Sequence, residues 1–348
     1  MARDDAVGLQ PFPGFETYPT NHCVTGSLKH VYDHHGYPIS EDLLLGLGHG
    51  IGFVYFHIKG TDPFFGGRAN MERPNEEGLE KTIGRRTGVV VESHTTSSAR
   101  KAQTELRSML IDEEPALVDL DMGFLPYFDF PEEYHFGGHT VVVAGHDPET
   151  DDVLVADRDP ALHTVGWDAL EQARGSTFKP FPPKHRWYTF DFSNARPPTP
   201  NDVREAIADA CQQMLEPPIS NLGVKGIRKA ADQTRNWPLI LDDAALRRTC
   251  FNTALFIDHR GGTGGGIFRY MYARFLVEAA AICNDPRLED LAPELEAIGD
   301  RWESVAVVFA QAAESADPVD QLNTVVDPML EIADLEQSFW ENLAATAV

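Results

Sequence analysis

The stretch that decides the fold is HTVVVAG at residues 139–145, followed by HDPETDD at 146–152 and VLVAD at 153–157. Both arms are apolar and rich in β-branched residues, and the segment between them contains Asp-Pro, which is typical of a turn. The pattern predicts a β-hairpin that begins at His139 and ends near Asp157. Directly paired residues of antiparallel strands point to the same face. With the turn centred near residues 148 and 149, Asp157 or Asp159 lies opposite His139.

Pairing alone does not choose between the two aspartates, because both have the parity to face His139. Asp157 directly ends the apolar run, whereas Asp159 precedes Pro160, which favours an extended turn conformation. We therefore predict that Asp157 accepts a hydrogen bond from the His139 ring and that Asp159 does not. The alternative interpretation is that His139 and Asp157 are simply two polar strand ends in water.

A helix is predicted over residues 21–35, with Thr20 or Asn21 as its cap. This places Cys23 in the first turn, where unpaired N–H groups and the helix dipole favour a negative charge. A thiol in this position has a lowered pKa, and the same N–H groups can hold the oxyanion of an acyl-transfer reaction. We expect Cys23 within hydrogen-bond reach of His139. The alternative is a cysteine that packs as a small buried hydrophobic residue.

The composition of the chain changes at NARPPTPN, residues 194–201. Before this segment the pattern predicts helices followed by a largely antiparallel sheet, with strands near 53–58, 88–92 and 115–120 ahead of the hairpin. After it nearly every segment is helical. The sequence therefore predicts an α+β protein with a domain at 1–195 and an all-α helical domain at 196–348.

Charge is the most distinctive feature of the composition. The chain has 54 Asp and Glu residues against 29 Lys and Arg, a formal net charge of −25. This favours a solvated acidic surface of the halophilic type and argues against nucleic acid as a partner, since phosphate binding needs a basic face. No apolar run is long enough to cross a membrane and the N-terminus does not read as a signal peptide, so we expect a cytoplasmic protein.

The cysteines and histidines show no metal-binding or cofactor-binding pattern. The 4 cysteines have no CxxC spacing, and the 13 histidines include no HExxH set, so neither a disulfide framework, nor a bound metal, nor a cofactor is expected. The glycine-rich runs at 46–52 and 261–269 lack the register or the lysine of nucleotide-binding loops.

A cysteine on an early helix, a histidine opening a later strand and an aspartate closing the next strand is the papain-like layout. The sequence itself resembles a narrower family, the N-terminal domain of butirosin-biosynthesis H acyltransferases, followed by the uncharacterised helical domain that often accompanies it. The N-terminal resemblance lies in HCVTGSLKHVY, LLLGLGHGIGFVYF, FGGHTVVVAGHD and VLVADRDP, and the C-terminal one in LGVKGIRKAADQTRNWP, GGTGGGIFRYMYARFLVEAA and DRWESVAVVFAQA. Together they cover nearly the whole chain.

This resemblance implies acyl transfer, with Cys23 forming an acyl-enzyme, His139 acting as base and then acid, and Asp157 orienting the imidazole. Papain-like enzymes usually place a glutamine just before the cysteine as an oxyanion donor, but the segment here reads ETYPTNHC. The candidates for oxyanion or substrate contacts are Asn21, His22, Thr17, Arg68 and His135.

Three functions remain open from the sequence. The first is an acyltransferase of secondary metabolism that moves an acyl or aminoacyl group from a thioester or amide donor, including a carrier-protein thioester, to a small amine. The second is a peptidase or amidase in which water accepts the acyl group. The third is a non-catalytic binding protein on a papain-like scaffold, which would be favoured if Cys23 were buried without a neighbouring imidazole. No membrane partner is expected.

Overall fold

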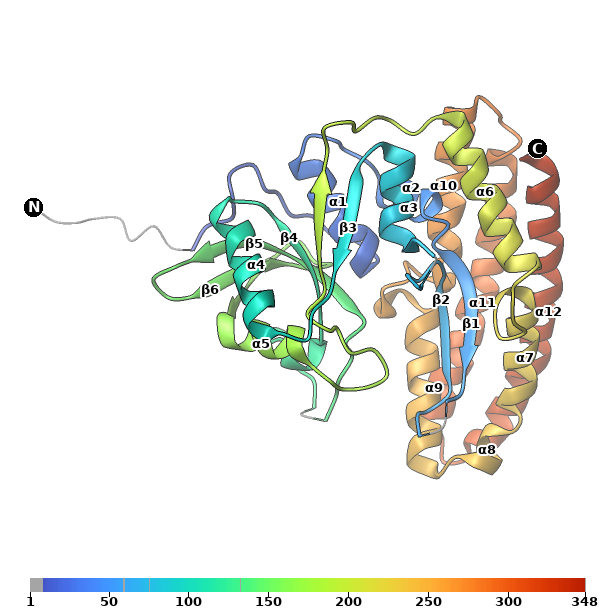
Figure 1. Cartoon of the computed structure of the whole chain (residues 1–348). Coiled ribbons are helices and arrows are strands. Elements are labelled where there is room, and N and C mark those ends of the chain that lie inside the picture. Colours follow the sequence, from blue (N-terminus) through green and yellow to red (C-terminus); the bar gives the residue numbers. More distant parts are fainter. Residues whose placement is uncertain (1–8, 59, 75, 132, 348) are drawn as a thin grey trace, which may run out of the picture. The chain divides into compact units, whose positions relative to one another are not determined.

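The computed structural model describes residues 9–347 except 59, 75 and 132. These residues divide into two compact units: one comprises residues up to 41 together with 89–195, and the other comprises 42–88 together with 196 onward. Figure 1 shows the strands of the first unit in cyan to yellow-green and the long helices of the second in yellow to red. The α+β class predicted from the sequence is confirmed.

The first unit is built on a six-stranded antiparallel sheet with the strand order β3-β8-β4-β5-β6-β7. Its strands are β3 (Val90–His94), β4 (Ala116–Leu120), β5 (His139–Asp147), β6 (Asp152–Ala156), β7 (Leu162–Gly166) and β8 (Trp187–Asp191). Its helices are α1 (Cys23–His34), α4 (Ala99–Ile111), α5 (Trp167–Gly175) and the short 3₁₀ turn η1 (Met122–Phe124).

Strand β5 lies in the middle of the core. Residues 139–145 are all buried, as expected for a strand that is covered on both faces of its sheet. Helix α1 packs on β4 and β5, and α4 and α5 pack on the same sheet. The hydroxyl of Ser27 on α1 donates a hydrogen bond to Thr140 O on β5 (3.2 Å), which fixes the helix against the strand that begins at His139.

The predicted hairpin is present as β5 and β6, but its register does not place Asp157 directly opposite His139. Val142 pairs with Ala156 and Val143 with Val155, and a bulge then shifts the register before Gly145. Continuing the pairs from Val142 would place Asp159, not Asp157, opposite His139. Strand β6 ends at Ala156, so Asp157 lies just beyond the ladder and its side chain is not directed by strand pairing.

The second unit is helical, with one added two-stranded sheet. The sheet consists of β1 (Ile51–Phe56) and β2 (Phe64–Arg68). The helices are α2 (Glu41–Leu47, whose first residue belongs to the first unit), α3 (Gly78–Thr87), α6 (Pro200–Leu215), α7 (Gly223–Thr234), α8 (Trp237–Ile240), α9 (Asp243–Ile257), α10 (Arg269–Cys283), α11 (Ala292–Glu314) and α12 (Pro318–Thr346). Short 3₁₀ turns lie at η2 (His259–Gly261), η3 (Gly266–Phe268) and η4 (Glu289–Leu291).

The domain division differs from the expected boundaries in residues 42–88. The chain does change units at residues 195 and 196, but the segment 42–88 groups with the helices and not with the sheet of the first unit. A two-stranded hairpin is too small to form its own core, so its apolar face needs a cover. Here Phe53 stacks on Trp302 of α11 (centroids 5.5 Å apart) and Phe65 packs against Trp237. The expected continuous domain 1–195 is therefore not one compact unit.

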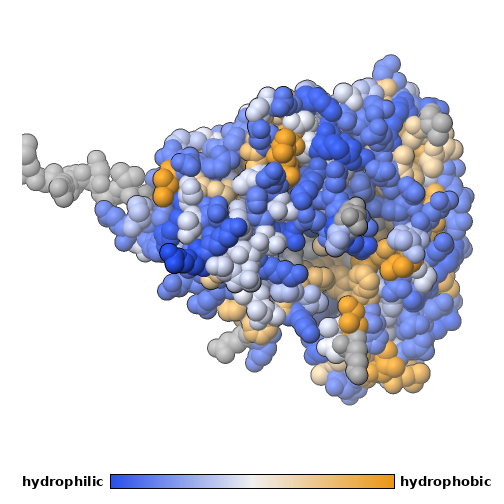
Figure 2. Space-filling model, viewed as in Figure 1, coloured by the Kyte–Doolittle hydropathy of each residue, from blue (hydrophilic) through white to orange (hydrophobic). Residues whose placement is uncertain are grey.

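The surface seen in Figure 2 is mostly hydrophilic, with hydrophobic residues in small groups. Within the described residues, no helix combines the length and the apolar character that a membrane span requires.

Candidate active site

Cys23 is the first residue of α1, which places its thiol at the N-terminus of the helix. The cap of the helix is His22, whose ring Nδ1 accepts a hydrogen bond from Thr25 N (3.4 Å), so neither Thr20 nor Asn21 caps it as expected. His22 is buried, whereas Cys23 is partly exposed. The helix start therefore places a thiol next to backbone N–H groups.

The structure joins the three predicted residues by hydrogen bonds. His139, buried at the first position of β5, shares a hydrogen bond with Cys23. Its ring Nε2 bonds Asp157 Oδ2 at 2.7 Å. Because Nε2 faces the carboxylate, Nδ1 is the nitrogen left to face the thiol. The prediction that Asp157 is the partner of His139 is confirmed, while the catalytic roles of the three residues remain predictions.

Asp159 is bound elsewhere. Its Oδ2 bonds His163 Nε2 (2.8 Å) and its Oδ1 accepts from Ala161 N (2.7 Å). Asp157 instead turns inward after the last pair of β6, and its Oδ1 accepts from Arg158 N (2.8 Å). The choice between the two aspartates is thus made by the loop that follows β6.

The electrostatics of the site favour a thiolate beside an imidazolium. Burial alone would raise the pKa of Cys23, but the hydrogen bond and charge of His139, with the backbone N–H of Thr140, outweigh it and lower that pKa. Burial alone would lower the pKa of His139, but the charge and hydrogen bond of Asp157, with a contribution from Cys23, raise it to about 10. Burial would raise the pKa of Asp157, yet mainly His139 lowers it to about 2.

Glu41 holds the segment before Cys23, and no motif in the sequence indicated it. Its Oε1 accepts from His22 N (2.6 Å) and Thr25 Oγ1 (3.1 Å), and its Oε2 accepts from Asn21 N (2.9 Å) and Asn21 Nδ2 (3.1 Å). Glu41 is buried, and burial raises its pKa despite these four donors. The carboxylate therefore fixes the segment that leads into Cys23. In the sequence its only signal is its place in Ser-Glu-Asp at residues 40–42, where α2 begins.

The remaining candidates divide between those held near the nucleophile and those held elsewhere. Asn21 directly precedes the cap of α1 and is tied to Glu41. Thr17 Oγ1 donates to Pro160 O (2.8 Å). His135 does not face His139: its Nδ1 bonds Asp121 Oδ2 (3.1 Å), and its ring stacks on Phe178.

Arg68 belongs to the second unit, where its guanidinium donates to Glu80 Oε1 (3.0 Å).

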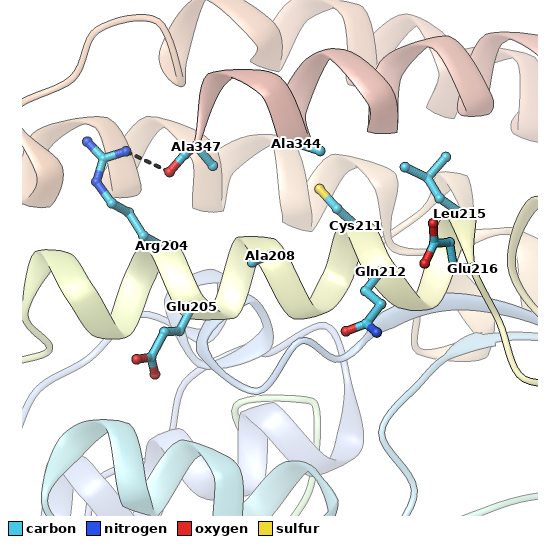
Figure 3. A pocket seen from close by; sticks show the side chains of 9 residues that line it. All are labelled: Arg204, Glu205, Ala208, Cys211, Gln212, Leu215, Glu216, Ala344 and Ala347. Atoms are coloured by element: carbon cyan, nitrogen blue, oxygen red, sulfur yellow. Dashed lines mark hydrogen bonds between the residues drawn. The ribbon is translucent and has the colours of Figure 1, made fainter.

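A cavity of about 520 Å³ lies in the second unit. Its lining residues are distant in the sequence from Cys23, His139 and Asp157. It is lined by Arg204, Glu205, Ala208, Cys211, Gln212, Leu215, Glu216, Ala344 and Ala347. Figure 3 shows Cys211 and Leu215 pointing toward the helix that carries Ala344, whereas Gln212 points away from it. Burial raises the pKa of Cys211 to about 12, so this thiol stays protonated. The lining contains no histidine that could serve as a base for that thiol.

The four cysteines are expected to react in a definite order with iodoacetamide at neutral pH, with Cys23 first. Its pKa is lowered, whereas burial raises the pKa of Cys211 and of Cys250 to about 12 and also raises that of Cys283. Since only the thiolate reacts, Cys23 should be labelled fastest, and its labelling should persist at pH values below those needed for a free thiol. Peptide mapping of time points checks this, and equal or slower labelling at Cys23 would contradict the ion pair.

Comparison with known protein families places this geometry in context. Residues 22–158 match the family described as Butirosin biosynthesis protein H, N-terminal, a range that begins beside Cys23 and ends beside Asp157. Residues 168–343, half of the chain, match the family described as Domain of unknown function (DUF4872). No individual curated protein matches the chain. The chain therefore belongs to the family of the domain of unknown function DUF4872, and its residues 22–158 match the N-terminal domain of butirosin biosynthesis protein H.

Proposed function

We propose that this protein is a cysteine-dependent acyltransferase that moves an acyl or aminoacyl group from a thioester or amide donor to an amine. The observation that carries the proposal is the hydrogen-bonded series Cys23, His139 and Asp157, with the pKa of the thiol lowered and that of the imidazole raised. The matched N-terminal family is named for a biosynthesis protein, which supports a synthetic role over a degradative one.

The first half of the reaction forms an acyl-enzyme. The Cys23 thiolate attacks the carbonyl carbon of the donor, forming a carbon–sulfur bond and a tetrahedral oxyanion. The imidazolium of His139 then gives its proton to the leaving group as the donor bond breaks. In the second half, the amine attacks the acyl-enzyme while neutral His139 accepts the amine proton. The carbon–sulfur bond breaks, the amide leaves and the thiolate–imidazolium pair is restored.

The N-terminus of α1 supplies the oxyanion site in this proposal. The N–H of Cys23, in the first turn, is directed out of the helix end. Asn21 is the proposed second donor, in place of the glutamine of papain-like enzymes. An amide nitrogen carries two hydrogens and one suffices for the bond to Glu41 Oε2 (3.1 Å), which also fixes the direction of the other.

Asp157 keeps the imidazole in one tautomer throughout. Both Asp157 and His139 are buried, so the bond between Nε2 and Oδ2 is shielded from water. With the Nε2 proton held by the carboxylate, proton transfer occurs at Nδ1, on the side of the thiol. The proposed donor is a thioester, including one on a carrier protein, and the proposed acceptor is a small amine.

Intact-protein mass spectrometry tests the proposal. Incubation with N-acetylcysteamine thioesters of several acyl groups is expected to add the mass of one acyl group, and an added amine should remove it and appear as an amide. Free acid formed at the same rate with and without amine would indicate a hydrolase. The absence of both adduct and product with every donor would contradict acyl transfer.

A further inference from the structure

The segment that precedes His139 forms a loop with fixed ends. Residues 122–131 and 133–135, the aromatic loop, lie between β4 and β5 and are rich in phenylalanine and tyrosine. The buried Asp121 closes the loop: its Oδ1 accepts from Gly123 N and Phe136 N, both at 3.0 Å, and its Oδ2 accepts from Ser176 Oγ at 2.6 Å. Because Asp121 directly follows a core strand, the ends of the loop are attached to the sheet that carries the site.

One side chain of the aromatic loop contacts Asp157. The Tyr127 hydroxyl donates to Asp157 Oδ2 at 2.9 Å, the same oxygen that His139 Nε2 bonds at 2.7 Å. Burial raises the pKa of Tyr127 far above its ordinary value, and the charge of Asp157 acts in the same direction, so the hydroxyl stays protonated. The hydroxyl is therefore the donor and the carboxylate is the acceptor.

The position of this hydroxyl is set independently of the bond it makes. The Tyr127 ring stacks on the imidazole of His163, with centroids 3.9 Å apart and planes at 18°. His163 is itself bonded to Asp159 Oδ2 at 2.8 Å. The next residue of the loop, Phe128, meets the His139 ring edge-on with centroids 6.1 Å apart. The aromatic loop thus contacts both Asp157 and His139.

We propose that Tyr127 is a positioning residue of the active site that acts through Asp157. Asp157 Oδ1 is held by Arg158 N at 2.8 Å, and the Tyr127 hydroxyl holds Oδ2, so the carboxyl group cannot rotate without losing a hydrogen bond. A carboxylate fixed in this way keeps Oδ2 aligned with Nε2 of His139. The inference rests on the proposed function in that the aligned imidazole serves acyl transfer.

The test is the substitution Tyr127→Phe, which keeps the stacked ring and removes only the hydroxyl. Without the hydroxyl, the Asp157 carboxylate is expected to be held less well against His139. The pKa of His139 should then fall and the pKa of Cys23 should rise. The acid limb of the pH profile of iodoacetamide labelling at Cys23 is therefore expected to move to higher pH. With a thioester donor, kcat is expected to fall about tenfold with KM unchanged, the size typical of one hydrogen bond to a charged group.

A matched control and a double variant separate positioning from general damage to the loop. Tyr134→Phe removes a hydroxyl from the same loop and should leave the labelling profile unchanged. If Tyr127 acts through Asp157, the decrease in kcat caused by Tyr127→Phe should be much smaller in the Asp157→Asn variant than in the unchanged protein. Additive effects, or a Tyr127→Phe profile whose acid limb stays in place or moves down while the circular dichroism spectrum is native, would overturn the proposal.

The labelling assay uses no acyl donor, so it separates this proposal from the proposed function. If no thioester acylates Cys23, acyl transfer fails while the labelling profile still decides the role of Tyr127. If acylation occurs and Tyr127→Phe changes neither the profile nor kcat, the positioning role alone is rejected.

Discussion

Replacing Cys23 with alanine is expected to abolish acyl-enzyme formation and to lower acyl transfer by at least about 10⁴-fold, the scale seen when a covalent nucleophile is removed. In the proposed mechanism the Cys23 thiolate is the group that forms the carbon–sulfur bond, so the acyl-enzyme cannot form without it. The side chain is only partly exposed and small, so the fold should persist. Intact mass after incubation with a thioester, with product formation measured in parallel, checks the result.

Cys283→Ala is the matched control. Cys283 is also partly exposed, but it ends α10 in the second unit and its thiol donates to Pro200 O (3.7 Å). This variant should be acylated and turn over like the unchanged protein. An adduct that persists in Cys23→Ala, or one that disappears in Cys283→Ala, would show that Cys23 is not the nucleophile.

Asp157→Asn is expected to lower kcat/KM by roughly 10³- to 10⁴-fold while the protein stays folded. The amide has nearly the shape of the carboxylate, but it lacks the charge that raises the pKa of His139 to about 10. Without that charge the imidazolium loses its proton at lower pH, so the basic limb of the rate profile should shift downward from this value. Loss of tautomer control at Nε2 adds to the effect, because an amide can donate where the carboxylate only accepts.

Asp159→Asn provides the comparison, because this residue lies two positions away and bonds His163. It is exposed, and asparagine keeps an oxygen that can accept a hydrogen bond from His163, so the replacement should leave kcat/KM within about a factor of two. The pH–rate profiles of both variants measure the difference. Equal losses in the two variants would show that the hydrogen bond between His139 and Asp157 has no special catalytic part.

Much of the local structure follows from the sequence because it depends on near neighbours in the chain. The apolar, β-branched runs at 139–145 and 153–157 form the expected hairpin, and the helical pattern after Asn21 forms α1 with Cys23 in its first turn. Side-chain periodicity and turn residues act over a few positions, so one sequence carries their signal. The hydrogen bond between His139 and Asp157 was predicted correctly, although Asp157 lies just beyond the end of β6 and not within the strand.

Other features of the site depend on segments that are distant in the chain. Glu41 reaches back 20 residues to Asn21, and Tyr127 lies 30 residues before Asp157, with no spacing rule that links either pair. The inward turn of Asp157 depends on the loop that follows β6, which ends at Ala156.

The sequence by itself determined the hairpin, the helix that begins at the nucleophile, and the identity of the three residues proposed for catalysis. The tertiary structure decided which groups hold those residues in place and where residues 42–88 belong. The physical reason is that a buried carboxylate needs donors, and a small hairpin needs an apolar cover, wherever in the chain these lie. Glu41 thus meets the segment before Cys23, Asp157 meets Tyr127, and Phe53 packs on Trp302.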